Sequence, residues 1–428
     1  MKLWEKGIPT DKQIEHFTVG NDRDLDLVLA KYDALGSIAH AKMLKNIGLL
    51  TVSEMDSLVI TLNEIIIDIE KGNFIIEDSF EDVHSKIEYL LTEKLGDAGK
   101  KIHTARSRND QVLVDVHLYL KDEIIALKDQ VKSLFDLMME MAEKHQNVLL
   151  PGYTHLQIAM PSSFGMWFSA YAESLIDDVT MLNAALKIVD QNPLGSAAGY
   201  GSSFPIDRTF TTKELGFETL KYNAVAAQMS RGKSEKTLAF AMSSVAATLS
   251  KFAMDVCLYM SQNFDFISLP AHLTTGSSIM PHKKNPDVFE LIRGKCNKIQ
   301  ALPYEITLIT NNLPSGYHRD LQLLKEGLFP AIQNLKACLD IALFSIKDIK
   351  VKDNILSDKK YDYLFTVDTL NEMVIAGMPF RDAYKAVAEQ LENGTFKSPK
   401  ETKHTHEGSI NNLCLNEIKS KMTQAFKS

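Results

Sequence analysis

Four short polar stretches hold the residues with which this sequence could do chemistry. They are "HTARSRNDQV" (103–112), "PGYTHLQ" (151–157), "TTGSSIMPHKKNPD" (274–287) and "PSGYHRDLQLLK" (314–325). Together they supply cations, amide donors, hydroxyls and an imidazole. This inventory suits a substrate that carries several carboxylates and a reaction made of proton transfers.

The stretch 274–287 is the richest of the four and is predicted to be a loop, because Gly276 and two prolines interrupt the helical pattern. A phosphate-binding loop would need a second glycine directly before the lysine and a Ser or Thr after it. The stretch has neither, which disfavours nucleotide binding. Asn285, Pro286 and Asp287 predict the start of a helix, so one end of the loop is fixed while its Gly-Ser end can move.

The other three stretches each have a functional and a purely structural interpretation. Arg108, just before a long helix, predicts an anion site through its planar donor fork, although a solvated helix cap would look the same. Thr154 and His155 follow a predicted Pro-Gly turn outside the apolar pattern, where His155 is either a proton-transfer group or a structural histidine. The residues of 314–325 could equally form a solvated helix face.

No metal or cofactor site is expected. The sequence contains no HExxH motif, no CxxC pair and no Asp-rich loop. Its four cysteines are scattered singly, which favours reduced and mostly buried thiols.

Helical periodicity dominates the elements that must position these stretches. Between 111 and 146 apolar residues recur every three or four positions, and Asn109 or Asp110 is expected to cap this helix. A second such pattern runs from 238 to 259, and further segments at 162–191, 286–312 and 323–348 complete five long helices. Apolar residues on more than one face of these helices favour self-association over one large monomeric bundle.

Length and composition indicate a soluble protein of several domains. The chain has 428 residues, of which 45% are hydrophobic and 24% charged. We expect an N-terminal helical domain at 1–105, a central domain at 106–350 and a small C-terminal domain at 351–428. A net charge of -8 argues against binding of nucleic acid or an anionic membrane. Residues 1–13 lack the apolar core of a signal peptide, so a cytoplasmic location is expected.

The polar stretches also carry a resemblance. "GSSIMPHKKNP" is similar to the signature loop of the fumarase and aspartase superfamily. With "HTARSRNDQV", "PGYTHLQ", "LPSGYHRDLQLLK" and "GMPFR", the sequence resembles the argininosuccinate lyases from about residue 33 to 390. The resemblance implies an all-α fold of three domains, whose central five-helix bundle forms a 20-helix core in a homotetramer. It also implies that each active site is shared between three subunits.

The activity that the resemblance implies is a carbon-nitrogen lyase reaction of arginine biosynthesis, without a cofactor. Argininosuccinate would be split into L-arginine and fumarate by anti elimination. By matching positions, Ser277 is the group for proton transfer at carbon, His155 the catalytic histidine and Glu290 the carboxylate that orients it. Lys283 would help to favour the Ser277 alkoxide. We predict that Ser277 is the base, although the reverse assignment of Ser277 and His155 stays open.

The same matching implies a set of substrate-binding residues: Asn109, Thr154, Asn285, Tyr317, Gln322, Lys325, Arg108 and His84. The sequence departs from the family at its N-terminal segment, where a substrate-contacting serine is missing and Asn21 or Asp22 is the candidate replacement. His282 and Lys236 also replace the residues common in the family. The alternatives are another fumarate-releasing lyase, such as adenylosuccinate lyase or fumarase, and a catalytically inactive relative like the delta crystallins.

Overall fold

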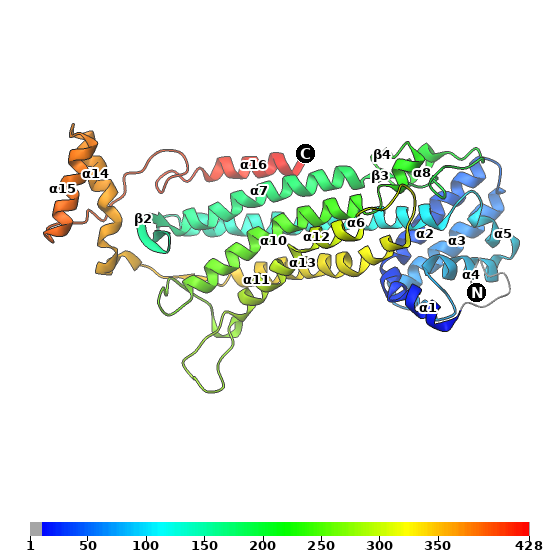
Figure 1. Ribbon diagram of the computed structural model, residues 1–428, viewed down its shortest axis with the longest axis horizontal. Coiled ribbons are helices and arrows are strands. Elements are labelled where there is room, and N and C mark those ends of the chain that lie inside the picture. The colour runs from blue at the N-terminus through cyan, green and yellow to red at the C-terminus, as the bar shows by residue number, and fades with distance from the viewer. Residues whose placement is uncertain (1–10, 428) are drawn as a thin grey trace. The chain divides into compact units, whose positions relative to one another are not determined.

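The computed structural model describes residues 11–427, and helices form nearly all of its regular structure (Figure 1). The described strands form three two-stranded sheets. The prediction of an all-α protein is therefore confirmed. The prediction about a signal peptide concerns mainly residues 1–10, which lie outside the described residues.

The chain divides into two compact units. Unit 1 contains the described residues up to Leu127, together with Met181–Ser243 and Ile299–Asn334. Unit 2 contains Lys128–Thr180, Ser244–Lys298 and the residues from Leu335 onward. The boundaries cross the long helices, so the same helices supply residues to both units. The three-domain division at 106 and 351 stays a prediction.

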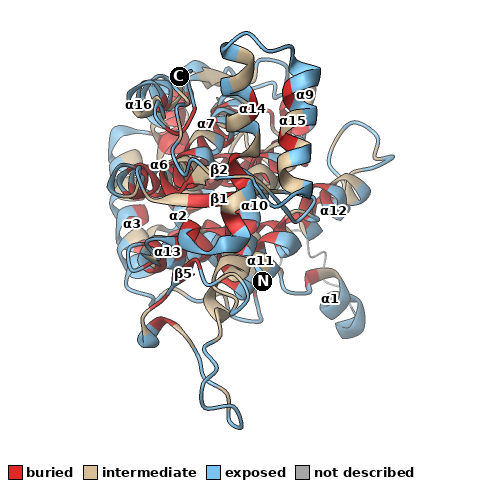
Figure 2. Ribbon diagram, turned by 90° about the vertical axis from the view of Figure 1, so that its left-hand side faces the viewer, coloured by how far each residue is buried: buried red, intermediate tan, exposed pale blue. Residues whose placement is uncertain are grey.

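The long helices lie close to where the apolar periodicity predicts them. They are α6 (Arg108–Lys144), α7 (Phe164–Val189), α10 (Lys233–Tyr259) and α13 (Leu324–Ile346). The periodic apolar residues of α6, from Leu113 to Met141, are all buried, as the red inner faces in Figure 2 illustrate. The burial of this stripe, rather than intrinsic propensity, stabilises such helices.

Two details of the predicted helices are wrong. The segment 286–312 forms two helices, α11 (Asp287–Ile299) and α12 (Leu302–Ile309). Pro303 lies in the first turn of α12, the position where a helix tolerates a residue without an N–H. In α6, Asn109 and Asp110 lie inside the first turn rather than before it. Ser107 Oγ accepts from Asn109 N at 3.3 Å, and Asp110 Oδ1 accepts from Ser107 N at 2.9 Å.

A β-hairpin was not predicted. Strands β1 (Leu149–Thr154) and β2 (Gln157–Ser163) pair antiparallel, and the expected Pro-Gly turn is wrong, because Pro151 and Gly152 lie inside β1. Gly152 is required there, since a Cβ would lie 2.8 Å from Met160 O. The turn consists of His155 and Leu156, with φ of 55° and 58°. Two positive φ values are typical of a type I′ hairpin turn.

In unit 1, four helices contribute to one apolar cluster that includes Leu44, Leu58, Leu62 and Leu91. They are α2 (Asp22–Asn46), α3 (Val52–Glu70), α4 (Val83–Leu95) and α8 (Arg208–Glu214). Unit 1 also contains the short helices α1 (Lys12–Val19), α5 (Asp97–Lys100) and α9 (Ala224–Gln228). The two short strands of this unit are β3 (Gln191–Asn192) and β4 (Thr219–Leu220).

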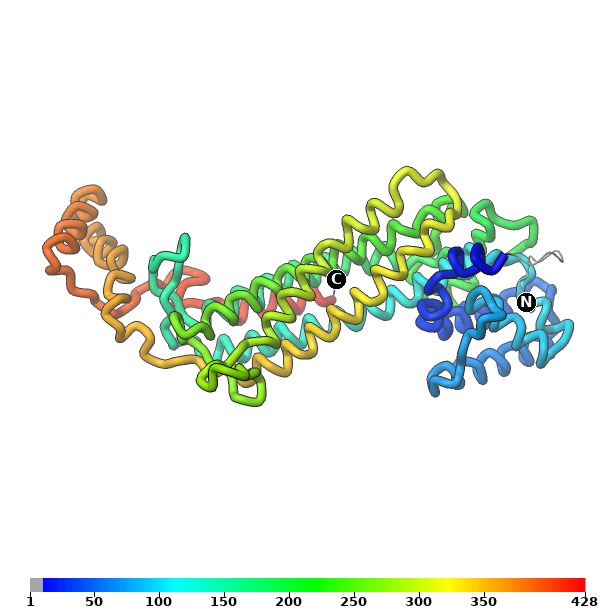
Figure 3. The backbone as a smooth tube through the Cα atoms, turned by 60° about the horizontal axis from the view of Figure 1, so that its bottom comes forward, coloured from blue at the N-terminus to red at the C-terminus, as the bar shows by residue number. Residues whose placement is uncertain are grey.

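In unit 2, aromatic and polar contacts join the long helices. The Trp167 ring on α7 stacks on Phe252 of α10 at 5.2 Å, and Asp255 accepts a hydrogen bond from the Trp167 indole at 3.0 Å. The remaining elements are β5 (Ile267–Ser268), β6 (Lys350–Val351), α14 (Thr366–Ile375), α15 (Phe380–Glu392) and α16 (Leu415–Lys427). In Figure 3, α14 and α15 pack against each other and a long connection leads to α16.

Two helical segments, Lys233–Tyr259 and Arg319–Ile346, are long and apolar enough to cross a membrane by length and composition. Within the 18-residue apolar stretch of each segment, 56% of the residues are buried in the first and 44% in the second. Core helices of soluble proteins pass the same test, so this is weak evidence for a membrane span.

Candidate active site

A cavity of about 240 Å³ in unit 1 brings together residues from segments far apart in the sequence. Its wall is formed by the junction of α1 and α2, the residues before and in α4, the start of α6 and the segment 317–325. Six of the twelve predicted site residues line it: His84, Arg108, Asn109, Tyr317, Gln322 and Lys325.

The cavity wall carries charges of both signs. Lys325 Nζ forms ion pairs with Asp22 and, at 2.6 Å, with Asp26. Burial opposes the charge on Lys325, but Asp26 and Asp22 outweigh it and raise the pKa of the ammonium group. Burial and the neighbouring Asp26 raise the pKa of Asp22 to about 6, against the effect of Lys325. A wall of this kind fits a ligand that itself has positive and negative groups.

Arg108 begins α6 and is held by acidic residues of its own chain. Its Nη1 lies 3.2 Å from Glu81 Oε2 and 3.0 Å from Asp82 Oδ2, and its Nη2 donates to Ser85 Oγ at 2.8 Å. Burial raises the pKa of Asp82, but His84 and Arg108 outweigh burial, so this pKa is lowered. These contacts fix the direction of the guanidinium group at the cavity wall.

The segment 317–325 is tied to the end of α1. Gln322 Nε2 donates to Thr18 O and Val19 O, both at 3.2 Å, and Arg319 Nη2 donates to Thr18 O at 3.0 Å. These hydrogen bonds join residues about 300 positions apart in the sequence. They hold the segment at the cavity.

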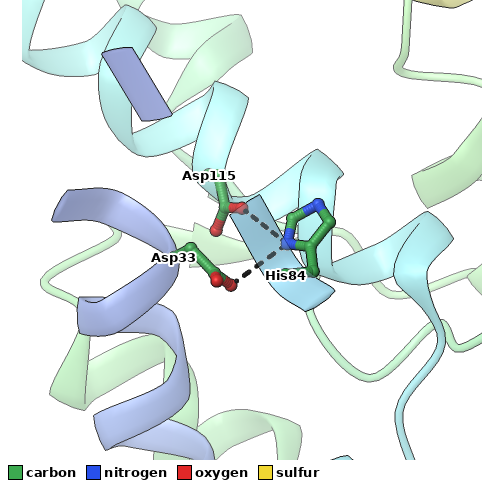
Figure 4. A group of neighbouring side chains, drawn as sticks. All are labelled: Asp33, His84 and Asp115. Atoms are coloured by element: carbon green, nitrogen blue, oxygen red, sulfur yellow. Dashed lines mark ion pairs between the residues drawn. The ribbon is translucent and has the colours of Figure 1, made fainter. Parts of the chain in front are cut away.

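His84 belongs to a buried group at the back of this wall (Figure 4). Its Nδ1 lies 3.3 Å from Asp33 Oδ1 and 3.7 Å from Asp115 Oδ2. Among residues 11–427, these three form a group whose ligand atoms lie within 4.8 Å of one another and could hold a metal ion. Asp33, His84 and Asp115 come from α2, α4 and α6, so no local sequence pattern indicates this group.

The second set of predicted residues lies in unit 2, and four of them belong to the loop 274–287 or to α11. Ser277 Oγ accepts hydrogen bonds from Met280 N at 3.1 Å and Ile279 N at 3.4 Å. Asn285 N donates to Thr275 O at 2.9 Å, and its side chain donates to Gly276 O at 3.2 Å. The side chains of Lys283 and Glu290 are exposed. The base of the loop is therefore closed by Thr275 and Asn285, while its tip projects into solvent.

Thr154 and His155 lie at the tip of the β1–β2 hairpin in the same unit, and both are exposed. His155 has a φ of 55°, a backbone conformation that is unfavourable for residues other than glycine and that they seldom adopt. Such strain is often found at functional sites.

Several cavity residues were missed by sequence reasoning. Asp26, Glu81, Arg231 and Arg319 line the cavity with the six predicted residues. Asp22 and Asp26 are four positions apart on α2 and therefore share one helix face. This spacing could have predicted from the sequence that the two carboxylates lie together. Of the two candidates for the missing family serine, Asp22 lines the cavity, whereas Asn21 is exposed.

The family match and the most similar relatives agree with each other. Residues 5–301 match the family described as "Lyase". The chain is 57% identical to the argininosuccinate lyase of Phocaeicola vulgatus, covering 99% of this chain and 95% of that protein. It is 42% identical to the argininosuccinate lyase of Thermotoga neapolitana, covering 91% and 98%.

Solved structures share the fold at low sequence identity. An EDDS lyase in complex with formate matches with a TM-score of 0.78 at 20% identity, covering 98% of this chain and 90% of that one. A Brucella melitensis protein described as fumarate lyase:delta crystallin, bound to cobalt, matches with a TM-score of 0.75 at 18% identity. That match covers 98% and 97% of the two chains.

Proposed function

The chain belongs to the lyase family and, within it, to the argininosuccinate lyases, and from this premise we propose that it splits argininosuccinate into L-arginine and fumarate. The observation that carries the proposal is the cavity of unit 1, in which six residues matched to the family share one wall with acids and bases. Argininosuccinate has carboxylates, an ammonium group and a guanidinium group, so a wall with both signs of charge is complementary to it.

Ser277 removes the proton from the carbon next to a substrate carboxylate. The proton is weakly acidic, so the intermediate gains negative charge that preorganised donors must stabilise. The two backbone N–H groups that donate to Ser277 Oγ would also stabilise its alkoxide. Lys283 and Asn285, on the same loop, supply a positive charge and amide donors for the carboxylates.

His155 donates a proton to the guanidinium nitrogen that leaves, and Glu290 orients the imidazole. An exposed imidazole at the tip of a hairpin is accessible to a ligand held by a neighbouring chain. Protonation of the leaving nitrogen avoids release of an unstable anion, which is the usual benefit of general acid catalysis.

The active protein is a cytoplasmic homotetramer in which one active site combines residues of several subunits. Large apolar side chains are exposed on the long helices, among them Ile125 on α6, Phe240 and Met254 on α10, and Phe344 on α13. Exposed apolar side chains on neighbouring long helices favour burial between subunits. The residues of unit 1 and unit 2 that act on one substrate would then come from different chains.

The test is release of fumarate, followed by its ultraviolet absorbance, from argininosuccinate, adenylosuccinate and malate in parallel. We expect turnover of argininosuccinate alone. Turnover of either other substrate instead would assign the chain to a different lyase of the superfamily. Absence of turnover with all three would identify an inactive relative.

A further inference from the structure

Asp33, His84 and Asp115 form a fully buried group that lies behind the cavity of unit 1 (Figure 4). Each residue comes from a different helix: α2, α4 and α6. The side chain of His84 is 6% exposed and lines the cavity, whereas the two aspartate side chains are 0% exposed. The group therefore connects the cavity wall to the interior of unit 1.

The two carboxylates face one nitrogen of the imidazole. Both approach Nδ1, at 3.3 Å from Asp33 and 3.7 Å from Asp115, while Figure 4 shows the second ring nitrogen turned away from them. Among the described residues, neither oxygen of Asp115 accepts a hydrogen bond. Two buried carboxylates directed at one nitrogen need a positive charge between them, which either a proton on the ring or a metal ion could provide.

The surroundings favour the proton. Gln111 Nε2 already donates to Asp33 Oδ1 at 2.6 Å, the oxygen nearest to the ring. Arg106 acts on both aspartates as a further positive charge and donates to Ser37 Oγ at 2.9 Å. Arg106 therefore already supplies one positive charge next to the two carboxyl groups. A divalent ion with a neutral imidazole would leave an excess positive charge where solvent is excluded.

We propose that Asp33 and Asp115 are positioning residues that keep His84 protonated at neutral pH, so that its Nε2–H acts as a charged donor to a substrate carboxylate in the cavity. The proposal rests on the proposed function only for the identity of that ligand. The His84 side chain would then bind the substrate without taking part in proton transfer. Asp33 and Asp115 touch no substrate and act through the ring.

The charges around the ring support this assignment. Burial alone would lower the pKa of His84, but Asp33, Asp82 and Asp115 outweigh it and raise the pKa to about 9. The positive charges near the ring are those of Arg106, which precedes α6, and Arg108, which begins it. His103 lies in the preceding turn and is neutral at pH 7, because burial and the two arginines lower its pKa to about 4. His84 lowers the pKa of Asp33 against the effect of burial, whereas burial and Asp33 raise the pKa of Asp115. Asp33 is therefore the stronger counter-ion of the two.

The first test compares Asp33→Asn with Asp24→Asn, an exposed carboxylate on the same helix. KM and kcat for argininosuccinate are measured from pH 6.5 to 8.5. We expect the ratio of the Asp33→Asn KM to the wild-type KM to rise about tenfold or more over this range, because the ring becomes neutral when its pKa falls toward 6.5. Asp24→Asn should follow the wild type at every pH. A KM ratio for Asp33→Asn that does not change with pH would reduce Asp33 to a structural role.

The second test does not depend on the substrate. In the wild-type protein labelled with ¹⁵N-histidine, we expect one of the 12 histidines to stay doubly protonated at pH 8, with a signal that is absent from His84→Gln. A neutral His84 ring at pH 7 would overturn the proposal, even if Asp33→Asn failed to fold. So would one divalent ion per chain by elemental analysis, if its removal by a chelator changed the same signal. Retention of the doubly protonated ring without turnover of argininosuccinate would reject only the proposed function.

Discussion

At the residue scale, the chemistry depends on side chains whose surroundings differ sharply. The cavity of unit 1 holds buried charges in fixed pairs, as Lys325 with Asp22 and Asp26 illustrates. Ser277, in contrast, lies in a loop whose tip is exposed, and its hydroxyl accepts hydrogen bonds from the backbone N–H groups of Ile279 and Met280. Buried pairs suit recognition of a fixed ligand, whereas an exposed loop can close over it.

Ser277→Ala removes the hydroxyl that is proposed to take the proton. We expect kcat to fall by at least about 100-fold, the low end for loss of a positioned proton-transfer group. The assembly should stay intact, because the loop is closed by Thr275 and Asn285 rather than by Ser277. Fumarate release measures the change, and light scattering checks the assembly.

Ser278→Ala is the matched control, because it removes a serine hydroxyl from the adjacent residue, which is exposed. It should keep most of the turnover. Equal losses in the two variants would show that the loop tolerates no change there, and would remove the specific role of Ser277.

At the element scale, the apolar pattern predicted the long helices, because a buried stripe needs a period of about 3.6 residues. The pattern did not predict the hairpin at 149–163. Its turn consists of His155 and Leu156 at positive φ, residues that rarely adopt this conformation and so give no turn signal. Pro151 and Gly152 predicted a turn at the wrong place. Gly152 is needed there because the backbone of Met160 lies too close for a Cβ, and not because the chain turns.

Buried neutral histidines of unit 1 predict a loss of stability in acid. In α6, His117 contacts Val189 O through Nδ1 at 2.8 Å and Ser230 Oγ through Nε2 at 3.2 Å, and burial lowers its pKa to about 4. Burial also lowers the pKa of His40 to about 3. Between these values and 6.5 the unfolded chain binds more protons than the folded chain. The free energy of unfolding should therefore fall as the pH drops from 6.5 to 4, by about 1.4 kcal/mol per pH unit for each group.

Denaturant unfolding at several pH values measures this dependence. His117→Asn removes one titrating group, so its free energy of unfolding should vary less steeply with pH below 6.5 than that of the wild type. A slope unchanged by the substitution would mean that His117 is not the buried neutral group described. His84 contributes in the opposite direction: with its pKa raised to about 9, its stabilisation is complete below pH 6.5 and is lost as the pH rises through 9.

At the scale of the whole molecule, the sequence alone did not bring the candidate residues together. Gln322 contacts Thr18 and Val19 across about 300 positions, and packing of the whole unit sets such a contact. Local pattern identified the individual stretches as polar ends of helices. Only the family resemblance predicted that these stretches act together on one substrate. The cavity of unit 1 identified further residues that the resemblance had not included.

The family resemblance implies a homotetramer, and the exposed apolar side chains on several long helices favour association of the chains. Light scattering should give a mass near four times the 48.0 kDa of one chain. Phe240→Asp places a charge on the exposed face of α10, and we expect it to shift this mass downward while leaving the helix content unchanged. A wild-type mass near 48.0 kDa would contradict the tetramer.

The most direct test of the central claim, that one active site combines the unit 1 residues of one chain with the unit 2 residues of another, mixes two impaired variants. Asn109→Ala alters the first group and Ser277→Ala the second, and each alone should release little fumarate. After the two are unfolded and refolded together in equal amounts, about a quarter of the sites should contain both intact groups if the groups come from different chains. Activity that stays at the average of the two parent variants would contradict the account, because both groups would then come from the same chain.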